Sequence, residues 1–160
     1  MRLDFMSTIL TSLCVAFLFP SLVSFSVAGD LPCDSSERRS ALAIGDRCGD
    51  AIYVGAVDGE QVYAEAVARD EKLTWAAATT TCAELGARWR VPGRAELKLL
   101  FDSRDAEALS GMLDAGWYWS SSLATGLSTP WALDFTSGNE ANASVGNRFA
   151  TRCVWSEGRS

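Results

Sequence analysis

The feature that most restricts the fold of this chain is its set of cysteines, taken together with an apolar N-terminus. The sequence begins with a short polar stretch, then an apolar run interrupted by Pro20, then the small residues Ser26-Val27-Ala28. This order predicts a signal peptide over residues 1–28 and export to the periplasm, the cell surface or the medium. A retained membrane anchor is the alternative, which Pro20 disfavours because proline interrupts an apolar helix.

Four cysteines remain after the predicted leader: Cys33, Cys48, Cys82 and Cys153. An even number of cysteines in an exported chain of about 130 residues is typical of two disulfides. Three pairings are possible, and we favour a local Cys33–Cys48 bridge and a long-range Cys82–Cys153 bridge. Because the chain has no histidine and no CxxC motif, we predict no zinc site and no cofactor.

The charge and the motif content restrict the class of function. With 14 basic and 20 acidic residues the net charge is −6, which argues against DNA, RNA or anionic lipid as partners. No membrane contact beyond the leader is predicted. The motifs of nucleophile elbows, P-loops and dinucleotide sites are missing, as is histidine, the most frequent general base. The acidic pairs Asp102/Asp105 and Asp70/Glu71 are typical of solvated charges, so we predict no enzymatic activity.

The order of local patterns predicts the secondary structure. Residues 29–47 are polar and form an expected N-terminal arm, residues 48–156 a single domain, and residues 157–160 a tail. The stretch "AIYVGAVDGEQVYAEAV" predicts a β-hairpin that turns at Asp58-Gly59, because both residue types accept left-handed backbone. Tyr53 and Tyr63 lie at similar distances from this turn and are expected to pair across it.

Two helices are predicted after the hairpin. The first, "TWAAATTTCAELG", has Thr74 as its N-cap and Gly86 as its stop. Helical spacing places four of its residues on one face toward the core: Trp75, Ala78, Cys82 and Leu85. The second helix starts near Arg94, after Pro92, and a short turn follows at 105–109.

Three β-type runs then complete the chain: "GWYWSSS", "PWALDFTSG" and "RFATRCVW". Strands and helices in this order predict an α+β fold. In a strand, Trp117 and Trp119 share one face, and Tyr118 and Ser120 share the other. We predict a core that contains five tryptophans: Trp75, Trp89, Trp117, Trp119 and Trp131. The alternative for Trp117 and Trp119 is an exposed platform on which a sugar ring stacks.

The predicted ligand surface lies in the polar links around the last strands, at residues 120–129 and 139–148. Small hydroxyl and amide groups there are suited to adaptable hydrogen bonding. The proposed contacts are Ser120, Ser121, Ser122, Thr125, Ser128, Asn139, Asn142 and Arg148. Oxygen-bearing residues between Asp134 and Asn147, including Glu140, are an alternative calcium site, although their spacing is more typical of turns.

The order of these motifs resembles one known family. "LTWAAATTTCAELG", "WRVPGRAELKLL", "GWYWSSS", "WALDFTSG" and "TRCVW" occur as they do in Lcl C-terminal domains. These are exported bacterial domains, largely of unknown function, that resemble C-type lectin domains and formylglycine-generating enzymes. The resemblance covers residues 44–156 and implies two helices, a mixed sheet and neighbouring termini. It also implies a link from the first-helix cysteine to the last-strand cysteine, here Cys82 and Cys153.

The chain departs from these relatives in two respects. Gly93 stands where a Thr or Ser cap is usual. The calcium-binding triplets of sugar-binding lectins, and the catalytic cysteines of formylglycine-generating enzymes, are missing. The resemblance therefore implies an exported, C-type-lectin-like binding module with a protein or glycan ligand. A structural or assembly subunit of a cell-surface complex is the alternative function.

Overall fold

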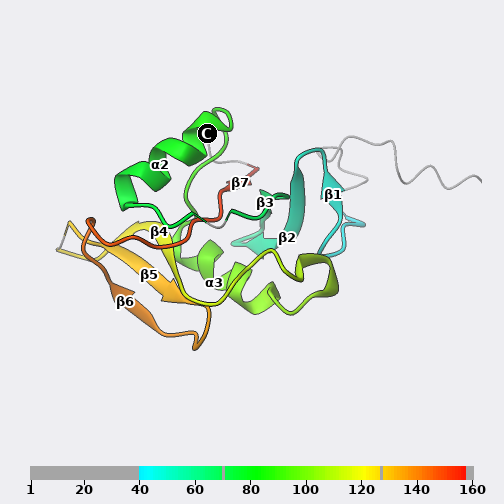
Figure 1. Ribbon diagram of the computed structural model, residues 1–160. Coiled ribbons are helices and arrows are strands. Elements are labelled where there is room, and N and C mark those ends of the chain that lie inside the picture. Colours follow the sequence, from blue (N-terminus) through cyan, green and yellow to red (C-terminus); the bar gives the residue numbers. More distant parts are fainter. Residues whose placement is uncertain (1–39, 70, 127, 158–160) are drawn as a thin grey trace, which may run out of the picture. The chain divides into compact units, whose positions relative to one another are not determined.

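The computed structural model describes residues 40–69, 71–126 and 128–157 (Figure 1). The predicted signal peptide, Cys33 with its predicted bridge to Cys48, Asp70, and the last three residues of the tail lie outside the described residues. The described part has the predicted α+β composition, with two α-helices, one short 3₁₀ helix and two antiparallel sheets. None of its helices is long and apolar enough to cross a membrane.

The first sheet contains the N-terminal hairpin and the last strand of the chain. Its order is β1-β2-β3-β7, and all its pairs are antiparallel. The strands are β1 (Arg47–Cys48), β2 (Ala51–Val57), β3 (Glu60–Glu65) and β7 (Val154–Ser156). On its other side β7 meets the backbone of Arg90, through two N–H···O bonds of 2.9 Å between Arg90 and Val154. The final strand is therefore enclosed on both edges.

The hairpin between β2 and β3 has the predicted turn. Asp58 and Gly59 have φ values of +52° and +82°, the left-handed conformation that a tight two-residue hairpin loop requires. Tyr53 pairs with Tyr63 as predicted, and their ring centroids lie 5.6 Å apart. The register that the Asp-Gly turn sets is shifted between Gly55 and Tyr53, and this irregularity brings the two tyrosines opposite each other.

The second sheet has the order β4-β5-β6, with β4 at Trp117–Leu123, β5 at Pro130–Asp134 and β6 at Glu140–Asn142. The prediction of "RFATRCVW" as one strand is wrong. Phe149 bridges to Leu73, Ala150 runs beside Tyr118, and only the segment from Val154 pairs with β3. The run is divided because Ala150 bonds to β4 of the second sheet, whereas Val154 begins the strand that pairs with β3 of the first.

Helix α2 spans Trp75–Glu84 and is capped as predicted, because the side chain of Thr74 accepts a hydrogen bond from Ala77 N at 3.4 Å. Ala78 and Cys82 are buried. The prediction that Leu85 faces the core is wrong, since its side chain is 40% exposed. Leu85 is the C-cap residue, so the helical periodicity that placed it on the buried face has ended there.

The predicted Cys82–Cys153 disulfide is present, with 5.4 Å between the two Cα atoms and a sequence separation of 71. Both cysteines are fully buried and share a core cluster with Trp119 and Val91. The bridge therefore connects α2 to the segment that leads into β7.

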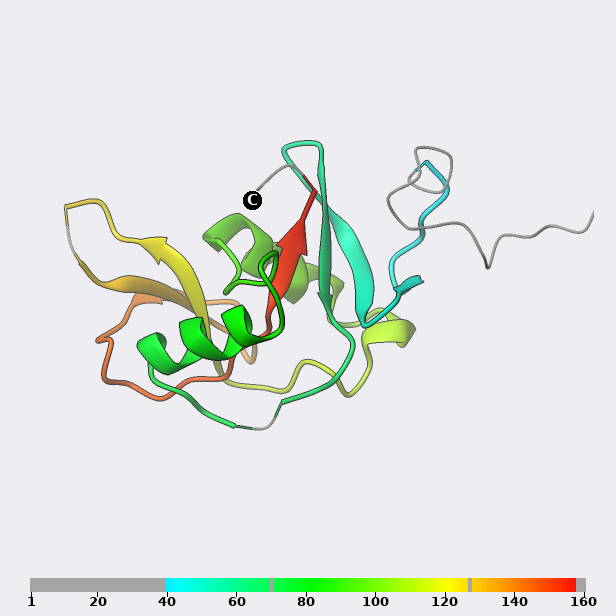
Figure 2. The ribbon, with the colours of Figure 1, turned by 90° about the horizontal axis from the view of Figure 1, so that it is seen from above.

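Helix α3 (Arg94–Ser103) lies between the two sheets, as the two views in Figures 1 and 2 show. Its residues Leu97 and Leu100 are buried in a core cluster that includes Val54 of β2 and Leu133 of β5. The 3₁₀ helix η1 (Glu107–Leu109) follows where a short turn was predicted. Because α3 packs against both sheets, its N-terminus is held in place, and the polar groups that bond to this N-terminus are held with it.

The alternation along β4 agrees with the expected strand geometry, and both of its faces are covered. Trp119 is fully buried and donates its indole N–H to Leu73 O at 2.7 Å. Trp117 lies on the same side, half-buried, and stacks on Phe149. Tyr118 is buried on the α3 side. The indoles of this strand therefore form part of the packing and not an exposed platform.

Candidate functional site

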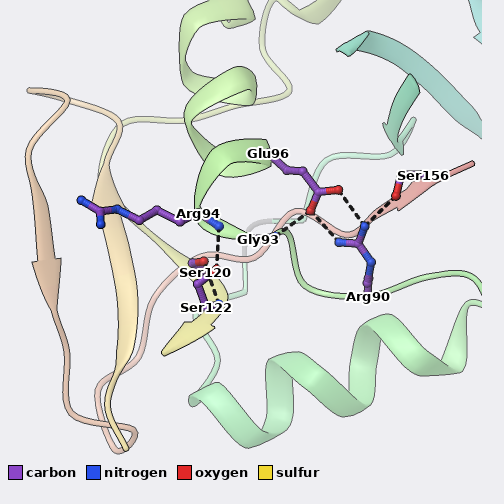
Figure 3. A network of polar contacts seen from close by, with 7 residues as sticks. All are labelled: Arg90, Gly93, Arg94, Glu96, Ser120, Ser122 and Ser156. Carbon is purple, nitrogen blue, oxygen red and sulfur yellow. Dashed lines mark hydrogen bonds and ion pairs between the residues drawn. The ribbon is translucent and has the colours of Figure 1, made fainter. Parts of the chain in front are cut away.

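A partly buried polar network holds the start of α3 (Figure 3). Arg90 donates to both carboxylate oxygens of Glu96, each at 2.6 Å, and to Ser156 Oγ at 2.8 Å. Glu96 also accepts from Gly93 N at 2.7 Å. The hydrogen bond with Glu96 raises the pKa of Arg90, against the opposing effect of burial. This network joins β7, the segment before α3, and α3 itself.

Two of the predicted ligand-contact residues lie beside the same N-terminus of α3. Ser122 Oγ accepts a hydrogen bond from Arg94 N at 2.9 Å, so it supplies the cap that Gly93 lacks (Figure 3). Ser120 is fully buried, its Oγ accepts from Ser122 N, and its carbonyl accepts the indole N–H of Trp75 at 2.9 Å. Ser120 is therefore closed to a ligand, which corrects its assignment to the contact surface.

The other predicted contacts are exposed but do not form one surface. Arg148 lies beside the segment before α2, where it donates to Lys72 O at 3.4 Å. Ser121, Thr125, Ser128 and Asn142 lie at the end of the second sheet where β4 and β6 terminate and β5 begins. The bond from Ala143 N to Pro130 O joins the two links there. Asn139 lies at the opposite end, in the turn before β6. Asn139 and the other five residues therefore cannot meet a small ligand together.

The α3-side surface of the second sheet carries an arginine that sequence reasoning did not place there. The Arg94 guanidinium lies 3.8 Å above the ring of Trp131 and pairs with Glu140, at 2.9 and 2.6 Å. The hydrogen bond to Arg94 lowers the pKa of Glu140 and raises that of Arg94. Arg94 and Glu140 thus neutralise each other, and the Arg94 guanidinium covers the half-buried indole of Trp131.

The residues considered for calcium are organised as a turn. The Asp134 carboxylate accepts hydrogen bonds from Thr136 N at 3.0 Å and from Ser137 Oγ at 2.7 Å. These bonds, that from Thr136 N first, lower the pKa of Asp134. In the described ranges no group of three or more acidic or cysteine side chains is arranged to hold a metal. The turn interpretation accounts for these contacts.

A hollow of about 280 Å³ opens at the first sheet, between the β1–β2 turn, the end of β3 and the segment that joins α2 to α3. We call it the Trp89 hollow. Its apolar lining consists of Ala66, Val67, Leu85 and Trp89. Its charged lining consists of Arg47, Asp50, Glu65 and Arg69.

The apolar residues of the Trp89 hollow are unusually open for their type. Val67 is 72% exposed, Leu85 is 40% exposed, and Trp89 keeps part of its indole accessible. Apolar side chains around a concave site, with a few charged groups among them, are the common composition of a ligand site. Sequence reasoning missed this site because it assigned Trp89 and Leu85 to the core and found no motif near Arg69.

The charged groups at the base of the hollow are held rigidly. Glu65 is nearly inaccessible; its two oxygens accept from Arg69 Nε at 2.7 Å and from Cys153 N at 3.1 Å. Arg152 lies behind it and donates to Val67 O at 2.6 Å. Burial lowers the pKa of Arg152, and the neighbouring Glu65 opposes this effect. The strand end and the linker that form the hollow are thus anchored to the disulfide-linked segment.

The fold defines the class of this protein as an α+β domain with an internal disulfide and two small antiparallel sheets. The family model described as the Lcl C-terminal domain matches residues 46–155, and the chain belongs to this family. The family indicated by the sequence motifs is confirmed. A search of curated proteins gives no match.

Proposed function

We propose that this chain is an exported binding module that holds a protein or glycan ligand in the Trp89 hollow. The observation that carries the proposal is the exposure of Val67 and Leu85 around a half-buried indole and two arginines. Covering such side chains with a ligand removes apolar surface from water, at about 25 cal/mol per Å². The Cys82–Cys153 disulfide is compatible with an oxidising compartment, as the predicted leader also suggests.

A non-catalytic role is part of this proposal. Asp102 pairs with Lys98 and Asp105 lies 3.6 Å from Arg104, so these acids have exposed ionic partners. Glu65 has both oxygens occupied. A general base must be open to the proton that it abstracts, and Glu65 does not meet this condition.

A second candidate, assembly into a surface complex, is favoured by a different observation. Leu123 and Val145 are about half exposed at the end of the second sheet where Ser121, Thr125 and Ser128 also lie. Two exposed apolar side chains among small polar ones suit a protein partner. The sequence-based loop surface therefore stays a proposal for a protein contact, with Ser120 excluded from it.

One pair of substitutions distinguishes between the two candidate surfaces. The mature protein is applied to a glycan array and to a library of random synthetic peptides with free C-termini, as the wild type, as Leu85→Ser and as Val145→Ser. Both positions are exposed, so each change is expected to alter stability by less than about 0.5 kcal/mol. Loss of bound glycans or peptides with Leu85→Ser alone supports the hollow. Loss with Val145→Ser alone supports the loop end, and retention by both variants contradicts both surfaces.

A further inference from the structure

We infer that the Trp89 hollow receives an apolar carboxylate, in the form of the C-terminal residue of a peptide chain. This inference rests on the proposed binding function of the hollow and names the chemistry of its ligand. Three properties of the hollow lead to it: the unused donors of Arg69, the position of the accessible negative charge, and the aliphatic character of the walls.

Arg69 is positioned to bind an anion. A guanidinium has five N–H donors in a planar fork, and Arg69 uses only Nε in its bond to Glu65. The four remaining N–H groups have no protein partner in the described part of the chain. The side chain is about one-third exposed and lines the hollow. A carboxylate is the group that such a planar fork binds with two parallel hydrogen bonds.

Glu65 fixes the orientation of Arg69 without competing for the ligand. Its Oε1 is held by the backbone N–H of Cys153, and its side chain is only 5% exposed. Because Glu65 is buried, the negative charge of the lining that a ligand can reach is that of Asp50. Asp50 disfavours a carboxylate at its own side of the hollow, which directs the anionic end of the ligand toward Arg69.

The walls select a hydrocarbon side chain over a sugar ring. Ala66, Val67 and Leu85 offer no hydrogen-bond partner from their side chains, so hydroxyl groups placed against them would lose their bonds to water. A leucine-like or aromatic side chain against Trp89 and Leu85 has no such cost. The volume of about 280 Å³ is near the lower limit of small-molecule sites, and it suits one terminal residue.

The inference is tested by titrating the full mature protein, labelled with ¹⁵N, with N-acetyl-leucine, N-acetyl-leucinamide and glucuronate. The six tryptophans give separate indole signals, and that of Trp89 is assigned by its loss in Trp89→Phe. N-acetyl-leucine is expected to shift the Trp89 signal saturably, with an affinity at least fivefold higher than that of the neutral amide. Equal affinities for the acid and the amide overturn the role of Arg69, and tighter binding of glucuronate overturns the peptide assignment.

Matched variants localise the effect. Arg69→Lys keeps the charge beside Glu65 but loses the planar fork, and it is expected to weaken N-acetyl-leucine binding at least fivefold. Arg148→Lys makes the same change at an exposed arginine that does not line the hollow, and it is expected to have no effect. If both variants bind alike, the guanidinium of Arg69 is not the anion site and the inference fails.

The outcome also separates this inference from the proposed function. If N-acetyl-leucine does not bind while Leu85→Ser still abolishes capture of library peptides or glycans, the hollow is a binding site for another class of ligand. If N-acetyl-leucine does not bind and Leu85→Ser also changes nothing, the proposed function fails together with the inference. Binding of N-acetyl-leucine that is lost in Leu85→Ser supports both.

Discussion

Trp119 and Trp89 were both predicted to belong to the core, and the structure encloses Trp119 completely but leaves Trp89 partly exposed at the edge of the core. Trp119 is enclosed on every side, its ring lies 4.6 Å from that of Phe149, and its N–H is bonded to Leu73 O. Trp89 is half-buried, lines a hollow, and its N–H has no protein partner among the described residues. Tryptophan thus completes the core packing at position 119, whereas at position 89 part of its ring stays open to a ligand.

The contrast extends to the polar groups around each tryptophan. The Trp119 region is formed by α2, the second sheet and the start of α3. Its polar side chains form hydrogen bonds within the protein, as in Ser120, Ser122 and the Arg94–Glu140 pair. At the Trp89 hollow, Arg69 keeps most of its donors available. We therefore expect substitutions in the Trp119 region to change stability and substitutions at the hollow to change binding.

The largest expected effect is that of Trp119→Ala. Truncation of a buried tryptophan costs about 3–5 kcal/mol, and the carbonyl of Leu73 also loses its donor. Trp89→Ala is expected to cost roughly half as much, because only part of its surface is buried. Urea unfolding followed by circular dichroism measures both free energies. Equal losses of unfolding free energy in the two variants would contradict the expectation that Trp119 contributes more to stability than Trp89.

A smaller effect is expected for Ser122→Ala, which removes the cap of α3. The loss of a side-chain cap lowers the free energy of unfolding by about 1 kcal/mol. Ser121→Ala is the matched control, since its exposed neighbouring side chain is expected to contribute less than about 0.5 kcal/mol. Thermal unfolding of both variants provides the measurement. A loss in Ser121→Ala that matches that in Ser122→Ala would contradict the capping role.

A pH dependence is expected from the Arg94–Glu140 pair. The pKa of Glu140 is lowered in the folded protein, so its stabilisation is complete above the ordinary pKa of a glutamate and is lost as the pH falls through the lowered value. Because both side chains are partly exposed, the contribution is below about 1 kcal/mol. The difference in unfolding free energy between wild type and Glu140→Gln is expected to shrink from pH 7 to pH 3. A difference that does not change with pH would assign the effect to packing.

The smallest change in stability is expected for Leu85→Ser. The side chain is exposed at the end of α2, so its replacement is expected to shift the free energy of unfolding by less than about 0.5 kcal/mol. The same variant is expected to lose binding in the hollow. Calorimetric unfolding checks the first statement independently of any ligand. A loss above about 2 kcal/mol would place Leu85 among the packing residues.

Local sequence signals account for much of the fold. Asp58-Gly59, Thr74 and Gly86 act on their immediate neighbours, so the hairpin and the limits of α2 were predictable from a few residues. The Cys82–Cys153 bridge followed from helical periodicity together with the family resemblance. The division of "RFATRCVW" between two sheets was not predictable, since its neighbours, Leu73, Tyr118 and β3, are distant in sequence.

The candidate site was less accessible to sequence reasoning. Ser122 looked like a loop hydroxyl because its partner, Arg94 N, lies 28 residues away. Leu85 continued the periodic pattern of a buried face, although the helix had ended. The Trp89 hollow is formed by three separate segments, none of which carries a recognisable motif. The contacts that form the hollow leave no recognisable pattern within any one of these segments.

The enclosed position of β7 has a consequence for how the chain folds. One edge of strand β3 stays unpaired until Val154–Ser156 have been made. The Arg90 segment, on the other side of β7, also stays unpaired until then. A nascent chain therefore cannot complete its first sheet until Val154–Ser156 have been made. Contacts of such long sequence separation slow folding, and an unpaired strand edge attracts other chains while it waits. We expect truncation before Val154 to yield an aggregating product, because β3 then keeps an unpaired edge.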